Sequence, residues 1–85
     1  MISKTVTVAI PSGIEHSPVA MLVQVASQYD SSIYLESGSK RVNAKSIMGM
    51  MTLGFNKGEQ IKICAEGNDE DNAVKKMEQF LSGQQ

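Results

Sequence analysis

Apolar and polar residues alternate along several short stretches of the chain, and this period of two predicts strands with one buried face. The stretches are residues 4–10, 33–36, 40–43 and 60–66. In the last of them Ile61, Ile63 and Ala65 share one face, so Cys64 is expected on the other. Ser37-Gly38-Ser39 separates the second and third stretches and predicts a hairpin turn.

Two further stretches carry apolar residues at helical spacing. Residues 18–29 begin with Pro18, which suits a first helical position, and Ser17 before it is the expected N-cap. The second helix opens at Asp69-Glu70-Asp71, where the helix dipole favours acidic side chains. The apolar stripes of the two helices are Val19, Leu22, Val23 and Ala26, and Ala73, Val74, Met77, Phe80 and Leu81.

A short helix is predicted over residues 46–53, with Ser46 as its N-cap. Ile47 and Leu53 are its expected core members, because short amphipathic helices usually bury such residues. The resulting order is strand, helix, strand, strand, short helix, strand, helix. Strands with one apolar face each imply an antiparallel sheet covered by helices on one side, which is a two-layer α+β sandwich.

Composition narrows the class of protein. The 85 residues leave room for one domain, 1–85, and 41% apolar with 20% charged residues is typical of a globular chain. A net charge of −1 argues against direct nucleic-acid binding. No apolar run reaches membrane-spanning length, the first residues lack a signal-peptide pattern, and the lone Cys64 fits a reducing compartment. We therefore expect a cytoplasmic protein that does not contact membranes.

The residues offer little for catalysis. One histidine and one cysteine cannot build an ordinary zinc site, and no P-loop or dinucleotide-binding glycine pattern occurs. We expect no metal, no cofactor and no catalytic turnover, and nothing in the sequence indicates that Cys64 is activated. His16 alone keeps phosphoryl or acid–base chemistry open.

The segment 42–51 is the most distinctive part of the chain. It reads Val-Asn-Ala-Lys-Ser-Ile-Met-Gly-Met-Met and, with Ser12-Gly13-Ile14 and the Gly67-Asn68-Asp69-Glu70 turn, it resembles the HPr family. These are histidine-containing phosphocarriers of the bacterial sugar phosphotransferase system. The similarity covers the whole chain and is greatest to HPr-like proteins of Gram-positive bacteria. It implies an open-faced β-sandwich, in which three helices cover one face of a four-stranded antiparallel sheet.

The resemblance fails at the family's active-site motif, Gly-Ile/Leu-His-Ala-Arg-Pro-Ala. Residues 13–19 read Gly-Ile-Glu-His-Ser-Pro-Val, and the register set by Pro18 places Glu15 where the family has its phosphorylated histidine. Ser17 replaces the arginine, so no cation offsets the carboxylate. At about 4 Å, like charges repel by roughly 1 kcal/mol in water and by more at lower dielectric. The sequence thus predicts poor phosphoryl transfer from phosphoenolpyruvate.

His16 and Glu15 each allow more than one interpretation. His16 lies one position late, and near a helix start that shift turns a side chain by about 100°. It is a displaced phosphoryl acceptor, an ordinary surface residue, or a ligand for a partner or metal. Glu15 mimics the charge of a modified site, or it is tolerated after the phosphocarrier function was lost.

Ser46 matches the regulatory phosphorylation site of Gram-positive HPr, together with its neighbours Lys45 and Ile47-Met48-Gly49. An N-cap role alone also explains a serine here, and the two roles are compatible. The resemblance further implies that partners dock on this region, with Ala20, Lys45, Ile47, Met48 and Met51 as candidate contacts. Lys40, Arg41 and Lys45 otherwise form a solvated basic edge.

Three functional hypotheses follow from the resemblance. In the first, HPr kinase/phosphorylase phosphorylates Ser46 and the product binds a LacI-type transcriptional repressor as corepressor, like the catabolite-repression paralogue of HPr. That paralogue usually carries glutamine, not glutamate, in place of the histidine. In the second, His16 accepts phosphate from enzyme I and passes it to sugar-specific components. In the third, the chain is a repurposed binding module with neither activity.

Overall fold

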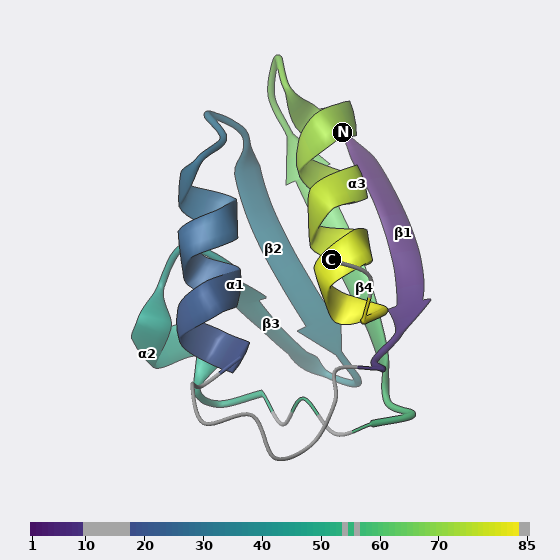
Figure 1. Cartoon of the computed structure of the whole chain (residues 1–85). Coiled ribbons are helices and arrows are strands. Elements are labelled where there is room, and N and C mark those ends of the chain that lie inside the picture. The colour runs from purple at the N-terminus through teal and green to yellow at the C-terminus, as the bar shows by residue number, and fades with distance from the viewer. Residues whose placement is uncertain (10–17, 54, 56, 84–85) are drawn as a thin grey trace.

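The computed structural model describes residues 1–9, 18–53, 55 and 57–83. In these residues the elements are β1 (Ile2–Thr7), α1 (Pro18–Ser27), β2 (Ser32–Ser37), β3 (Lys40–Asn43), α2 (Ile47–Met50), β4 (Gln60–Glu66) and α3 (Glu70–Leu81). The strands form one antiparallel sheet in the order β1-β4-β2-β3. Helices α1 and α3 lie against one face of the sheet, and α2 lies beside α1 near β3 (Figure 1). The predicted two-layer α+β sandwich is confirmed.

The core lies between the sheet and the helices, as the periodicity predicted. Ile61 and Ile63 of β4, Leu22 and Ala26 of α1 and Met77 of α3 are all fully buried and belong to one apolar cluster. The core also includes Val6, Val8, Ile33, Leu35, Met50, Leu53, Val74 and Leu81. Burying these apolar side chains is the main source of stability for a domain of this size.

The first predicted strand is shifted. It runs over Ile2–Thr7 instead of residues 4–10, because β4 extends to Glu66 and pairs Ile2 with Ala65. Ala9 leaves the sheet edge, since its backbone N–H donates to the carbonyl of Leu81 at the end of α3 (2.8 Å). Pairing between strands therefore fixed a boundary that local alternation placed too late.

The prediction for the short helix was partly wrong. Ser46 is the N-cap of α2 and Leu53 is buried, as expected, but Ile47 is 52% exposed and does not belong to the core. Met50 takes the inward position and is completely buried. Its backbone N–H donates to the Ser46 carbonyl (2.9 Å), so the short helical turn itself directs Met50 inward.

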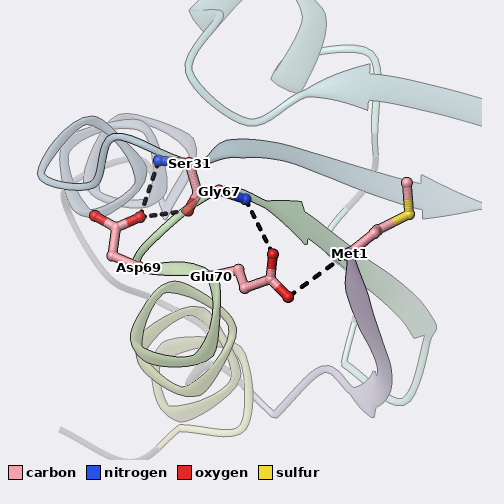
Figure 2. A network of polar contacts seen from close by, with 5 residues as sticks. All are labelled: Met1, Ser31, Gly67, Asp69 and Glu70. Atoms are coloured by element: carbon pink, nitrogen blue, oxygen red, sulfur yellow. Dashed lines mark hydrogen bonds and ion pairs between the residues drawn. The ribbon is translucent and has the colours of Figure 1, made fainter.

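A polar network joins the loop after α1 to the loop before α3, and we call it the Ser31–Asp69 corner (Figure 2). The Asp69 carboxylate accepts hydrogen bonds from the backbone N–H of Asp30 and of Ser31, each at 2.9 Å, and from the Ser31 hydroxyl. Glu70 accepts from the Gly67 N–H (3.0 Å). Because Asp69 bonds across to the other loop, it makes no side-chain cap bond to its own helix.

None of the helices in the described ranges has both the length and the apolar character needed to cross a bilayer.

Candidate functional site

Ser46 is held by the loop that connects β3 to α2. The Asn43 side-chain oxygen accepts from the N–H of Lys45 (2.8 Å), and the Asn43 carbonyl accepts from the N–H of Ser46 (3.0 Å). Ala44 between them is buried, and its N–H donates to the Ile33 carbonyl of β2 (2.8 Å). The sheet thus fixes the position from which Ser46 begins α2.

The Ser46 hydroxyl lies at the start of α2. Its backbone is extended, with φ −106° and ψ 115°, as is usual for an N-cap, and its Oγ accepts from the N–H of Gly49 (3.2 Å). The residue is partly exposed. A hydroxyl with this placement stabilises the helical turn and remains at the molecular surface.

The exposed side of α2 is apolar. We call this side, together with the surface of α1 around Ala20 and Met21, the α1–α2 face. Met48 is 82% exposed, Met51 is 69% exposed and Ile47 is 52% exposed. Met48 and Met51 are three residues apart and so lie on the same side of the helical turn. Their exposure leaves both methionines accessible to a partner, and their partner-binding role stays a prediction.

A shallow groove of about 540 Å³ runs between α1 and α2. Its lining residues are Ala20, Met21, Val23, Gln24, Ser27 and Ile47. The structure therefore brings two predicted contact residues, Ala20 and Ile47, into one groove. Sequence reasoning missed Met21, Gln24 and Ser27, and it placed Val23 only in the apolar stripe of α1. The signal was available, because residues 20, 24 and 27 recur at helical spacing next to Val23, along one border of the apolar stripe of α1.

Among the described residues, two lysine ammonium groups contact backbone at the border of the α1–α2 face. Neither α1 nor α2 contains an ionisable side chain. The Lys45 ammonium donates to the carbonyl of Tyr29 just after α1 (2.7 Å), and the Lys40 ammonium donates to the carbonyl of Thr52 just after α2 (3.1 Å). Arg41 lies elsewhere, over the ring of Tyr34 at 4.4 Å. The predicted basic edge is therefore not purely solvated, since each of these cations has a specific partner.

The candidate residues of the degenerate loop, Glu15, His16 and Ser17, lie outside the described residues. The N-cap role expected of Ser17 therefore stays a prediction.

Cys64 lies on the face of the sheet away from the helices, as the alternation of β4 predicted, yet it is only 5% exposed. Its sulfur is 3.6 Å from Oε2 of Glu36. Burial raises the pKa of the Cys64 thiol, and the neighbouring Glu36 charge raises it further. A protonated, shielded thiol is a poor nucleophile, which fits the inert role expected for Cys64.

Comparison with known proteins gives consistent matches. Residues 2–83 match the family described as "PTS HPr component phosphorylation site". The chain is 41% identical over 81 residues to the HPr-like protein Crh of Halalkalibacterium halodurans, which covers 95% of this chain and 96% of the relative.

Two solved structures show the same fold. The phosphocarrier protein HPr of Bacillus anthracis superposes with a TM-score of 0.86 at 36% identity, over 94% of this chain and 95% of the other. The catabolite repression protein Crh of Bacillus subtilis superposes with a TM-score of 0.73 at 36% identity, over the whole of both chains. On the evidence of the sheet order, the helix placement and these matches, the chain belongs to the HPr family.

Proposed function

We propose that this chain is a Crh-like regulator of carbon catabolite control that acts in the cytoplasm without catalytic turnover. HPr kinase/phosphorylase phosphorylates Ser46, and the product binds a LacI-type transcriptional repressor as corepressor. The observation that carries the proposal is the position of Ser46. Its hydroxyl opens α2 directly beside the exposed apolar side chains of Ile47, Met48 and Met51.

Phosphate and methionines would act together on the partner. A phosphoserine adds a charge of about −1.5 to −2 and three strong acceptor oxygens, which suit arginine or lysine side chains of a partner. An exposed ion pair alone contributes only about 0–1 kcal/mol. Met48 and Met51 supply the desolvated apolar area that tight binding requires. The proposal therefore requires both features on one surface, and the adjacency of Ser46 to the α1–α2 face supports it.

Phosphorylation assays test the first half of the proposal. The protein is incubated with ATP and HPr kinase/phosphorylase, and separately with phosphoenolpyruvate and enzyme I, and the phosphate is located by mass spectrometry. We expect phosphate on Ser46 in the first reaction only. Ser46→Ala should abolish the incorporation, whereas Ser39→Ala, a control at an exposed serine of the β2–β3 turn, should leave it unchanged.

The same assays address the alternative of a phosphocarrier. Rapid, acid-labile phosphate on His16 would favour that function over the proposed one. If transfer is absent because Glu15 and Ser17 replace the family's histidine and arginine, Glu15→His with Ser17→Arg should restore it.

Titration calorimetry with the repressor tests the second half. Phosphorylation of Ser46 should raise the affinity, and Met48→Ala with Met51→Ala should weaken the phosphorylated complex by more than about 1 kcal/mol, as for anchor residues. Lys75→Ala with Lys76→Ala is the control, since both lysines are exposed on α3 away from the groove. Equal binding by both phosphorylation states, or none by either, would leave the repurposed binding module as the better description.

A further inference from the structure

The six methionines of the chain fall into two sharply different environments. Met50 and Met77 are completely buried in the core, whereas Met48 is 82% exposed and Met51 is 69% exposed. Met21, at the groove between α1 and α2, is 42% exposed, and Met1 is exposed far from that groove at the start of β1. Three of the exposed thioethers thus belong to one surface, the α1–α2 face.

We propose that Met48 and Met51 form a site of selective, reversible oxidation by hydrogen peroxide, which turns the α1–α2 face from apolar to polar. The effect on partner binding rests on the function proposed above, whereas the selectivity of the oxidation does not. The thioether sulfur is oxidised, and hydrogen peroxide is the oxidant.

The chemistry needs only access of peroxide to sulfur. A sulfur lone pair attacks one peroxide oxygen, the S–O bond forms as the O–O bond breaks, and the departing hydroxide takes the proton from the sulfur-bound oxygen and leaves as water. Sulfur loses two electrons and the peroxide gains them. The product, methionine sulfoxide, is returned to methionine by the sulfoxide reductases, so the change is reversible.

The surroundings make this oxidation consequential. No ionisable side chain lies on α1 or α2, and the groove beside Ile47 is lined mainly by apolar atoms of Ala20, Met21 and Val23. A partner shaped to this surface offers apolar groups to the methionines. A sulfoxide oxygen would enter such an interface as an acceptor without a donor, and an acceptor left unpaired on desolvation is costly.

The fold itself should survive the oxidation. The exposed sulfurs at 48 and 51 contribute little to the core, whereas Met50 between them lies inside it. Oxidation at Met50 would place a polar group in the core and destabilise the domain. The proposal therefore predicts that the oxidised protein stays folded and loses only the apolar character of its α1–α2 face.

The first experiment follows oxidation residue by residue. The protein is treated with hydrogen peroxide and digested after lysine, which leaves Met48, Met50 and Met51 in one peptide, 46–57. Fragment masses then assign the oxygen. We expect Met48 and Met51 to react at least about tenfold faster than Met50 and Met77, with circular dichroism unchanged and with reversal by the reductases. Equal rates at Met48 and Met50 would overturn the proposal, as would failure of the reductases to restore the thioethers.

The second experiment measures the consequence for the surface. Oxidised protein should elute earlier from a hydrophobic-interaction column, and oxidised phosphoprotein should bind the LacI-type repressor roughly tenfold more weakly, the loss caused by one unpaired desolvated acceptor. In Met48→Leu with Met51→Leu, the changes of elution and affinity caused by peroxide should be largely lost, whatever the starting values, because only Met1 and Met21 remain as exposed thioethers. Met21→Leu is the control and should keep most of the response, and a response that is lost with Met21 instead of with Met48 and Met51 would overturn the proposed site.

The two proposals fail in different ways. If the unoxidised phosphoprotein does not bind the repressor, the proposed function is wrong, and residue-level rates with column elution still decide the oxidation site. If the phosphoprotein binds and oxidation leaves the affinity unchanged, the corepressor function stands and the oxidation proposal is wrong.

Discussion

The α1–α2 face runs along α1, the Ser31–Asp69 corner lies in the loop just after that helix, and the two regions use their side chains in opposite ways. At the corner, Ser31 is 1% exposed and its backbone N–H and hydroxyl both bond to Asp69. At the face, Met48 is 82% exposed and the groove beside Ile47 is open. At the corner, polar groups form hydrogen bonds that join two loops. At the face, apolar side chains remain exposed to water.

This contrast separates stability from binding. A satisfied polar network positions backbone segments that are far apart in sequence, because each unpaired buried group would be costly. An exposed apolar patch stabilises nothing in the isolated domain, and its value lies in contact with a partner. We therefore expect substitutions at the corner to change unfolding and substitutions at the outer α1–α2 face to change association.

The largest effect should come from the residue that lies directly behind that face. Met50→Ala removes a fully buried side chain, and we expect a loss of about 3 kcal/mol in the free energy of unfolding. Met48→Ala, on the exposed side of the same helical turn, is the matched control and should stay within about 0.5 kcal/mol of the parent. Urea denaturation measures both. Similar losses for the two variants would contradict the assigned orientation of α2.

A smaller loss is expected from a crowded contact at the corner. Gly67 has φ +155°, and a Cβ added there would lie 2.5 Å from Oγ and 2.7 Å from Cα of Ser31. Because the Cα belongs to the backbone, one of the loops must move, and Gly67→Ala should cost about 2 kcal/mol by urea denaturation.

Gly38→Ala gives the control for that substitution. Gly38 has φ +61° in the β2–β3 turn, and nothing lies within 4 Å of an added Cβ. It should lose only the cost of the left-handed backbone, about 1 kcal/mol. An equal loss at both glycines would show that the contact with Ser31 does not matter.

The sequence predicted what local periodicity determines and missed what depends on distant contacts. The face of Cys64 followed from alternation along β4, and the cap at Ser46 followed from residue type. Around α2, however, Ile47-Met48-Gly49-Met50-Met51 is apolar on every side, so no period showed that Met50 and not Ile47 is buried.

The site was predicted to a similar degree. The methionines and Ile47 could be chosen from residue type and resemblance, whereas the groove required the packing of α1 against α2. The Ser31–Asp69 bond joins residues 38 positions apart, and neither residue's own neighbourhood indicates the pairing. The preference of the helix dipole for acidic residues placed Asp69 at the start of α3 but could not show that its carboxylate bonds to the other loop.

Acid should weaken the corner selectively. The pKa of the Asp69 carboxyl is lowered, first by the hydrogen bond from the Ser31 hydroxyl and then by that from the Asp30 backbone. Its contribution to stability is therefore fully present above the unfolded-state pKa of about 3.9 and is lost as the pH falls through the lower folded-state value. Urea midpoints measured from pH 6 to pH 2 should fall in that acid range.

Asp69→Asn should flatten this part of the profile, because the side chain at 69 no longer titrates. Asp71→Asn, at an exposed carboxylate two residues further along α3, is the matched control and should retain the acid-dependent loss. An unchanged profile in Asp69→Asn would assign the acid sensitivity to another group.

The smallest effect tests whether Ser46 contributes to the fold before any modification. Ser46→Ala removes the oxygen that accepts from the Gly49 N–H, and we expect a loss of about 1 kcal/mol in the free energy of unfolding, typical of an N-cap. Ser46→Asp should recover most of this loss, because aspartate caps helices about as well as serine. Thermal or urea denaturation of the three proteins checks the order. If Ser46→Ala is as stable as the parent, the hydroxyl contributes nothing as a cap, and the serine is then explained by its modification alone.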